Sequence, residues 1–186
     1  MRLRWSFPAA GRRCWVAEQV VLGIGSNAGD REAYLMRAVE LLCQKESVNL
    51  AAASSIYETP PLDVPSPQGD FLNQVVVIST SLPPTRLLAL CQETEAILGR
   101  PRDHTAGASR TIDIDLISYG SLIHNSGQLV LPHPGYARRR FVLVPLAEVL
   151  PDFKDPLTGH SIRRLLEDCP DASIVHRWDS FQEAPC

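Results

Sequence analysis

The sequence lacks the features of a membrane protein, a disulfide-bonded protein or a general nucleic-acid binder. No window offers an apolar run long enough to cross a bilayer. The five cysteines are odd in number, scattered and without CxxC spacing, which argues against a disulfide framework and a zinc site. With 18 Lys and Arg against 21 Asp and Glu, the net charge of -3 provides no bulk attraction for nucleic acid. We therefore expect a soluble protein of a reducing, cytoplasmic compartment, without nucleic-acid or membrane partners.

The length of 186 residues allows one domain with a full core. Residues 1–19 carry four arginines and no acid before Glu18, and their apolar piece is short and broken by Pro8. We expect a disordered leader there; an organelle transit sequence is the less favoured alternative. A single domain is predicted over 20–170, with a C-terminal tail over 171–186. The sequence does not determine the oligomeric state, and we favour a monomer.

Hydrophobic periodicity predicts the order strand, helix, strand, strand, helix, strand. The strands are expected over 20–25, 48–59, 71–82 and 111–120, and the helices over 31–42, capped by Asp30, and over 83–99. Because only a loop separates the second and third strands, a doubly wound parallel sheet is disfavoured. The order is that of an α+β, ferredoxin-like (split βαβ) fold, an antiparallel sheet with helices on one face.

Further elements are predicted around this unit. A short strand over 128–134 and helices over 138–150 and 161–169 would be additions to the ferredoxin-like core. Two open loops, 60–70 and 100–109, are long for a compact domain, and such loops are often functional. We expect the second loop to act as a lid over a bound substrate.

Two aspartates interrupt an otherwise apolar strand in the segment SRTIDIDLISYG, residues 109–120. Because side chains alternate along a strand, Asp113 and Asp115 share one face, about 6–7 Å apart along the backbone, and the apolar neighbours face the core. The sheet should therefore have one apolar and one acidic face. A solvated outer face explains a bare DxD pattern equally well. A central position instead favours a compensating cation, either Mg²⁺, which keeps water and substrate phosphates as further ligands, or a pair of metals.

Arginines cluster in the segments that flank this strand. Arg100 and Arg102 lie in one loop, and three consecutive arginines occupy 138–140. Each alone is typical of a solvated surface. Next to a carboxylate pair, however, they suit phosphate oxygens, and acids, metal and arginines together are what phosphoryl transfer requires.

Six separated motifs occur in order between about Val20 and Leu150: GIGSN, SSIYETPPL, FLNQVV, GRPR, SRTIDIDLI and LPHPGYARRRFVLVPL. In these motifs the chain resembles the 6-hydroxymethyl-7,8-dihydropterin pyrophosphokinase family. The resemblance implies transfer of diphosphate from MgATP to the hydroxymethyl group of 6-hydroxymethyl-7,8-dihydropterin, with release of AMP, in folate biosynthesis. It also implies two Mg²⁺ ions bound with ATP.

The resemblance further implies a role for each matching position. The metal ligands would be Asp113 and Asp115, which with Arg100 and Arg110 form the catalytic set. Contacts to ATP would come from Gln92, Glu95, Arg102, Arg110, His133 and Arg139. The pterin would be bound by Thr59, Pro60, Leu62, Phe71, Asn73 and Phe141. By composition alone the two phenylalanines would be core residues, Gln92 and Glu95 exposed helix surface, and His133 the end of a strand.

Two other interpretations remain open. Common members of the family carry a tryptophan and extra basic residues in the second loop, where this chain has Asp103, Ala106 and Gly107. Gln128 and Pro134 likewise replace an arginine and a tyrosine found in some relatives. A non-catalytic pterin or nucleotide binder of the same fold is therefore one alternative. A dinucleotide-binding module is the other, although the glycines of GIGSNAGD lack GxGxxG spacing and favour a tight strand-to-helix turn.

Overall fold

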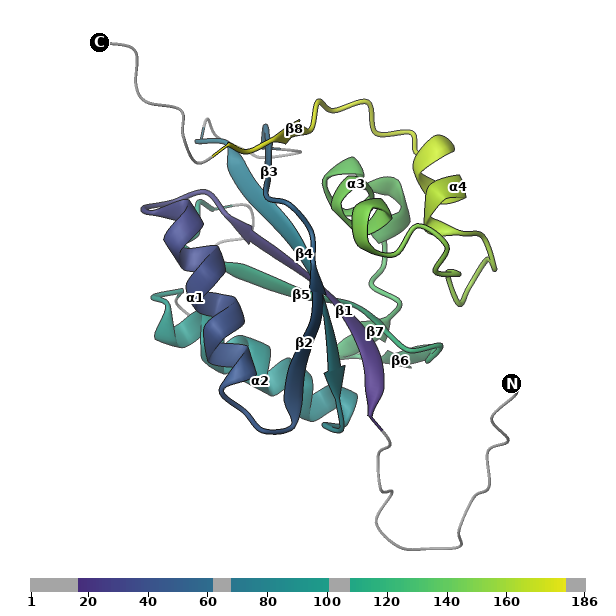
Figure 1. Ribbon diagram of the computed structural model, residues 1–186, viewed down its shortest axis with the longest axis horizontal. Helices are drawn as coiled ribbons and strands as arrows, with labels where there is room; N and C mark the ends of the chain where they lie inside the picture. The colour runs from purple at the N-terminus through teal and green to yellow at the C-terminus, as the bar shows by residue number, and fades with distance from the viewer. Residues whose placement is uncertain (1–16, 62–67, 101–107, 180–186) are drawn as a thin grey trace, which may run out of the picture.

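An antiparallel sheet with helices on both sides makes up most of the structure, a computed structural model that describes residues 17–61, 68–100 and 108–179 (Figure 1). The elements, in chain order, are β1 (Glu18–Ser26), α1 (Arg31–Cys43), β2 (Val48–Ala53), β3 (Tyr57–Thr59), β4 (Phe71–Thr80), α2 (Pro84–Ile97), β5 (Asp113–Tyr119), β6 (His124–Ser126), β7 (Leu129–Leu131), the 3-10 turn η1 (Tyr136–Arg138), α3 (Arg140–Val149), α4 (Ile162–Glu167) and β8 (His176–Arg177).

The strand order in the sheet is β5-β1-β4-β3-β8, and β2 pairs with β4 alongside β3. Every pairing is antiparallel. The single strand predicted over 48–59 is divided in two. At the break, the Ser54 hydroxyl accepts a hydrogen bond from the Val75 backbone N–H at 3.0 Å and so replaces a strand carbonyl. The ferredoxin-like order is therefore confirmed, with a broken second strand.

Helices α1 and α2 cover one face of the sheet, as predicted (Figure 1). The Asp30 carboxylate caps α1 by accepting a hydrogen bond from Ala33 N at 3.2 Å. Leu35 and Leu42 of α1, with Leu87 and Cys91 of α2, pack on the apolar side chains of β1, β4 and β5. This layer is the main core, and it fixes which face of β5 the aspartates must occupy.

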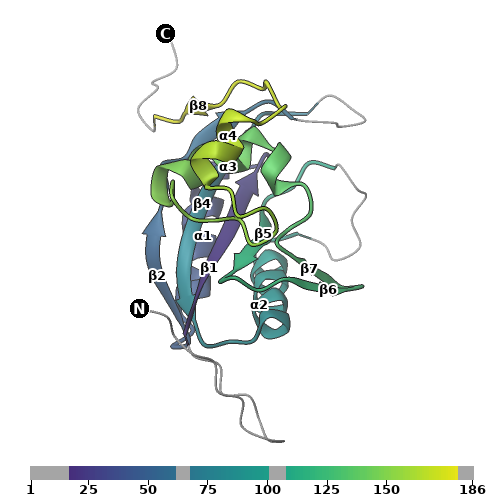
Figure 2. The same cartoon turned by 90° about the vertical axis from the view of Figure 1, so that its right-hand side faces the viewer.

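The opposite face is only partly acidic, which corrects the expectation of a uniformly acidic surface. One end of this face carries Val21, Val75 and Ile117, which pack under Val142 and Leu143 of α3. Figure 2 shows α3 and α4 in front of the sheet, on the side opposite α1 and α2. Because α3 covers the apolar end, the polar end with the aspartates becomes the floor of a recess instead of an open surface.

Short elements connect β5 to α3. The strand predicted over 128–134 is β7, which pairs with β6 in a separate two-stranded hairpin. The His133 backbone N–H then donates to Ile117 O at 2.8 Å, which returns the chain to the edge of β5. The helix predicted from residue 138 begins at Arg140, because η1 occupies the preceding turn. No helix in the described ranges is long and apolar enough to span a membrane.

Regular structure extends slightly beyond both ends of the domain predicted over 20–170. Strand β1 begins at Glu18, inside the predicted leader, and residues 1–16 lie outside the described ranges. The predicted tail contains β8, which pairs with β3, and Trp178, whose backbone N–H donates to Ile56 O at 2.9 Å. The Trp178 indole donates to Glu32 at 3.0 Å and lies 5.1 Å from the Arg31 guanidinium. The tail therefore links β3 to α1.

Replacing Trp178 with phenylalanine should lower the free energy of unfolding by about 0.5–1.5 kcal/mol, since it removes the indole hydrogen bond to Glu32 and keeps a ring for Arg31. Urea denaturation followed by circular dichroism measures the change. His176→Ala is the control, because this exposed side chain lies in β8, two residues before Trp178. An unchanged midpoint for the Trp178 variant would show that these contacts add nothing.

Candidate active site

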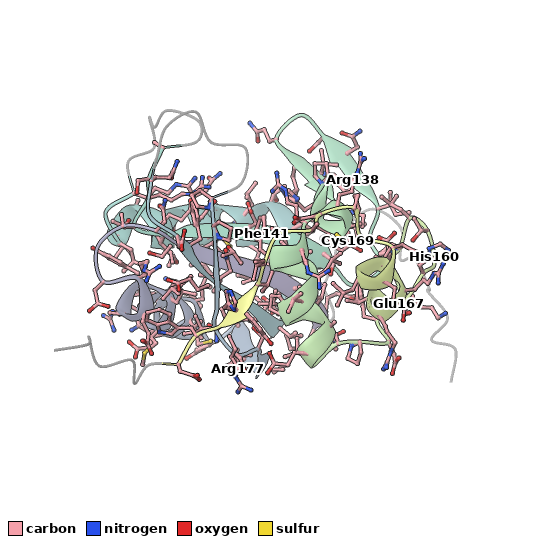
Figure 3. All side chains as sticks on the ribbon, turned by 90° about the horizontal axis from the view of Figure 1, so that it is seen from above. Arg138, Phe141, His160, Glu167, Cys169 and Arg177 are labelled. Carbon is pink, nitrogen blue, oxygen red and sulfur yellow. The ribbon has the colours of Figure 1, made fainter. Side chains whose placement is uncertain are left out.

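A cavity of about 260 Å³ lies at the polar end of the second sheet face, beside the first turn of α3. Its walls come from β1, β3, β4, β5 and α3, from residues far apart in the sequence. The lining residues are Gly23, Ile24, Gly25, Thr59, Pro60, Phe71, Asn73, Gln74, Val75, Arg110, Asp113, Asp115, Ile117, Arg139, Phe141 and Val142. Figure 3 shows Phe141 near the middle of the molecule, with His160 and Glu167 at its periphery.

The floor of the cavity is made by two glycines of β1. Gly25 pairs with Asp113 on one side and Asn73 on the other, and Gly23 pairs with Asp115. A Cβ atom on Gly25 would lie 3.0 Å from Asn73 Oδ1, so a side chain there would fill the recess. The interpretation as a strand-to-helix turn holds only for Gly29, whose φ is 68°. Two glycines at alternate positions of an otherwise β-branched strand leave space above one face of the sheet. This pattern is the feature of the sequence that could have predicted the cavity.

Asp113 lies between two arginines. The Arg100 guanidinium contacts the carboxylates of both Glu95 and Asp113, and Arg110 Nη1 lies 3.2 Å from Asp113 Oδ2. The Glu95 carboxylate also accepts a hydrogen bond from the Ile114 backbone N–H at 2.8 Å. Glu95 therefore connects α2 to β5 and orients Arg100. Its side chain reaches Asp113 only indirectly, through Arg100.

Asp115 carries a charge that the protein compensates poorly. Its burial, followed by the nearby charge of Asp113, raises the pKa of the carboxyl group above its usual range. His133, Arg139 and Arg110 act in the opposite direction, through charge alone. In the described ranges no hydrogen bond to the Asp115 carboxylate is found. An added cation would therefore stabilise the ionised pair.

The two carboxylates suit a hard cation better than a structural transition-metal site. Among the residues that the structure describes, no group of three or more His, Cys, Asp or Glu could hold a metal ion. Asp113 and Asp115 instead offer two sets of carboxylate oxygens on the face of β5 that lines the cavity. Mg²⁺ is commonly held by one or two carboxylates, with water and phosphate oxygens in the remaining positions. The donor set thus fits Mg²⁺ bound together with a nucleotide.

Aromatic rings and a buried amide form the other end of the cavity. Phe71 and Phe141 are each half-buried and line the cavity, and Phe141 also packs against the apolar cluster under α3. An arginine lies over each ring, Arg110 at 5.3 Å from Phe71 and Arg139 at 5.8 Å from Phe141. The Asn73 amide donates to Thr59 Oγ1 at 2.8 Å and keeps its carbonyl toward Gly25.

The structure gathers most of the predicted site. The cavity is lined by Thr59, Pro60, Phe71, Asn73, Arg110, Asp113, Asp115, Arg139 and Phe141. Arg100 and Glu95 join through Asp113, and His133 approaches Asp115 closely enough to affect its pKa. Gln92 is exposed on α2 and does not line the cavity. Leu62, Arg102 and the differing positions 103, 106 and 107 lie outside the described residues.

Comparisons with known proteins agree with this arrangement. The family 7,8-dihydro-6-hydroxymethylpterin-pyrophosphokinase (HPPK) matches residues 21–151. A 2-amino-4-hydroxy-6-hydroxymethyldihydropteridine pyrophosphokinase of Methylorubrum extorquens is 43% identical over 153 residues, which cover 82% of this chain and 94% of that protein. The enzyme of the same name from Bacillus subtilis is 46% identical over 128 residues, covering 69% of this chain and 75% of its own length.

Solved structures give the same fold. The wild-type HPPK-DHPS of Plasmodium falciparum with SDX-DHP matches with a TM-score of 0.68 at 14% identity, over 83% of this chain and 44% of that chain. An HPPK-DHPS in complex with substrates matches with a TM-score of 0.66 over 82% of this chain and 43% of that chain. This chain thus spans less than half of these solved proteins, and the likeness is one of fold. The family match over residues 21–151 and the identity to the two bacterial enzymes show that the chain belongs to the HPPK family.

Proposed function

We propose that this chain transfers a diphosphate group from MgATP to the hydroxymethyl group of 6-hydroxymethyl-7,8-dihydropterin, releasing AMP, as a step of folate biosynthesis. Family membership and the names of the relatives support the reaction. The observation that carries it is the juxtaposition, within one cavity, of an aspartate pair with arginines at one end and an aromatic–amide pocket at the other.

The pterin occupies the aromatic end of the cavity in this proposal. Phe71 and Phe141 provide ring faces for a flat heterocycle, and the buried Asn73 amide provides paired donor and acceptor positions for its polar edge. Thr59 orients that amide, and Pro60 continues the wall. Leu62, which the family resemblance also assigns to the pterin, lies outside the described residues.

The ATP phosphates occupy the charged end. Asp113 and Asp115 would hold Mg²⁺, two ions with ATP, and the bound metal would neutralise charge on the phosphate oxygens during transfer. Arg110 and Arg139 line the cavity and would contact those oxygens, and Arg100 is held at Asp113 by Glu95. His133 contributes from the edge of β5, and Gln92 would contact the nucleotide from the exposed side of α2. Arg102, which the family resemblance also assigns to ATP, lies outside the described residues.

No covalent enzyme intermediate is needed for this reaction. The pterin hydroxymethyl oxygen attacks the β-phosphorus of ATP, the bond to the AMP oxygen breaks in line, and the hydroxymethyl proton leaves to a carboxylate or to water. Neither Cys91 nor Ser109 is an activated nucleophile. Burial raises the pKa of the Cys91 thiol to about 12, and the Ser109 hydroxyl donates a hydrogen bond to Asn27 Oδ1 at 3.1 Å and not to a catalytic base. Catalysis then depends on positioning and on charge.

The two alternative interpretations are weaker. A non-catalytic binder has no use for the assembly of Arg100, Arg110, Asp113 and Asp115 at one end of the cavity. A dinucleotide-binding module needs a parallel βαβ unit with its glycines in the first turn, whereas Gly23 and Gly25 lie inside an antiparallel strand.

The test is AMP release in a coupled assay with wild-type protein, ATP and 6-hydroxymethyl-7,8-dihydropterin. AMP should form only when Mg²⁺ and the pterin are both present, one AMP for each diphosphorylated pterin. ATP hydrolysis to ADP, or AMP formation without the pterin, would overturn the proposal. Tight pterin binding with no AMP would favour the non-catalytic binder.

Adding a methyl group to the cavity floor should block the pterin and spare the fold. Gly25→Ala places a Cβ 3.0 Å from Asn73 Oδ1 and 3.8 Å from a Phe71 ring carbon, so it displaces the amide and shortens the pocket. We expect the pterin KM to rise at least about tenfold, ~1.4 kcal/mol of binding free energy, with a smaller effect on the ATP KM.

The matched control for this variant is Gly127→Ala, because a Cβ at Gly127 would meet no atom within 4 Å. Its kinetics should equal those of the wild type. Equal pterin KM values for the two alanine variants would place the pterin elsewhere. Melting curves for both proteins show whether the β1 substitution affects folding.

A further inference from the structure

Asn27, directly after β1, connects the two segments that enter the cavity. Its side-chain carbonyl oxygen accepts hydrogen bonds from the Arg110 backbone N–H at 2.7 Å and from the Ser109 hydroxyl at 3.1 Å. Its own backbone N–H donates to Arg110 O at 3.1 Å. One side of Asn27 therefore fixes the backbone of Arg110, just before β5.

The other side of the same amide reaches the segment before β4. Asn27 Nδ2 donates to Gln68 Oε1 at 2.6 Å and to Gly69 O at 3.3 Å. These contacts join positions 41 and 42 residues apart, whereas those to Ser109 and Arg110 span 82 and 83 residues. Asn27 is only 7% exposed, so its amide has exchanged water for these partners.

The two bridged segments lead directly to a pair of cavity side chains. Gly69 lies two residues before Phe71, and the Arg110 guanidinium lies 5.3 Å from the Phe71 ring. Arg110 also pairs with Asp113 at 3.2 Å. The spacing between the aromatic end and the charged end of the cavity thus depends on how the segments around Gly69 and Arg110 are held together.

We propose that Asn27 is a positioning residue for diphosphate transfer: its amide holds Arg110 over Phe71 and so sets the distance between the pterin site and the phosphate site. The inference rests on the proposed function. Asn27 itself is not among the residues that line the cavity. Because the reacting oxygen and phosphorus must meet in line, a small displacement between the two ends should slow turnover more than it weakens either substrate's binding.

An amide is the side chain that this junction requires. One end of the group must accept hydrogen bonds, from Arg110 N and Ser109, and the other must donate to two oxygens, of Gln68 and Gly69. An aspartate has the same shape but no donor, and it would face those two oxygens with a negative charge. Asn27→Asp therefore keeps the hydrogen bonds from Arg110 and Ser109 and removes those to Gln68 and Gly69.

The experiment compares Asn27→Ala, Asn27→Asp and Ser109→Ala with the wild type. For Asn27→Ala we expect kcat to fall about 30-fold or more, about 2 kcal/mol in the barrier, with the pterin Kd changing less. The kcat of Asn27→Asp should lie between those of Asn27→Ala and the wild type. Ser109→Ala removes the hydroxyl that contacts Asn27 Oδ1 and Asn27 O on the Arg110 side, keeps the Arg110 N–H bond, and should lower kcat severalfold.

The controls separate positioning from folding. Asn49→Ala alters an exposed asparagine of β2, far from the cavity in the sheet, and should match the wild type in kcat. A purely structural role for Asn27 would lower the melting temperature and the active fraction without changing kcat per active site, and this result would overturn the proposal. If Asn27→Ala does not fold, an unchanged kcat for both Asn27→Asp and Ser109→Ala overturns it equally.

The design also distinguishes failure of the inference from failure of the proposed reaction. Wild-type protein that releases no AMP refutes the proposed function. In that case calorimetric titration of the pterin without ATP still decides the role of Asn27, because displacement of Phe71 should raise the pterin Kd of Asn27→Ala severalfold. A Kd equal to that of the wild type would then count against the bridge.

Discussion

Asp115→Asn should reduce kcat by about three orders of magnitude, comparable with the largest losses on removal of a single charge-stabilising group. The substitution keeps the shape of the side chain and removes one of the two carboxylates that share a face of β5. With one carboxylate left, the proposed magnesium would be held less tightly, and the transferring group would lose part of its charge compensation. Raising the Mg²⁺ concentration should recover only a small part of the rate.

The same variant should be more stable than the wild type at neutral pH. Burial and the charge of Asp113 raise the folded-state pKa of Asp115 above the value of about 3.9 for an unfolded aspartate. Between these two pKa values the native state binds more protons than the unfolded state, so ionisation of Asp115 lowers stability as the pH rises. The stability advantage of the Asp115→Asn variant over the wild type should therefore vanish below about pH 3.9 and be complete above the folded pKa.

Melting curves over this pH range, without metal, measure the effect. Asp152→Asn is the control, because the Asp152 side chain is 87% exposed and its distance to Arg163 is 3.8 Å. Near-normal kcat for Asp115→Asn at saturating Mg²⁺ would remove Asp115 from the mechanism. A loss of stability at pH 7 would show that the carboxylate has a structural partner.

The alternation of aspartate and apolar residues in β5 was sufficient to predict which face the carboxylates share. The reason is local: side-chain direction along a strand depends on position alone. Asp30 as the cap of α1 follows from a similarly local rule and is confirmed. The order of strands and helices then restricted the sheet to one plausible topology, which the structure and its relatives confirm.

What the sequence did not reveal depends on contacts between distant segments. The packing of Val142 and Leu143 on Val75 converts an open sheet face into a cavity wall, and no local pattern specifies that docking. The contacts of Asn27 join segments up to 83 residues apart. Gly25 is informative only once its neighbours Asp113 and Asn73 are known from the strand register. The assignments to ATP and pterin remain predictions.

Arg110→Lys should separate the charge of the guanidinium from its shape. Arg110 meets Asp113 at 3.2 Å while its planar group lies 5.3 Å from the Phe71 ring. A lysine ammonium keeps the positive charge but offers neither a flat face nor a two-pronged donor to phosphate oxygens. We therefore expect kcat to fall about 100-fold for Arg110→Lys and about 1,000-fold for Arg110→Ala, in the range for loss of one preorganised donor.

Steady-state kinetics with both substrates measure these losses, and Arg37→Lys is the matched control, since Arg37 is exposed on α1 and pairs with Glu40. Three outcomes have different meanings. Equal losses for lysine and alanine would show that guanidinium geometry, not charge, supports transfer. Full activity of the lysine variant would show that charge suffices and that the contact with Phe71 is incidental. A rise confined to the pterin KM would move Arg110 from the phosphate end to the pterin end, because an interaction made equally in the ground and transition states changes KM and leaves kcat unaltered.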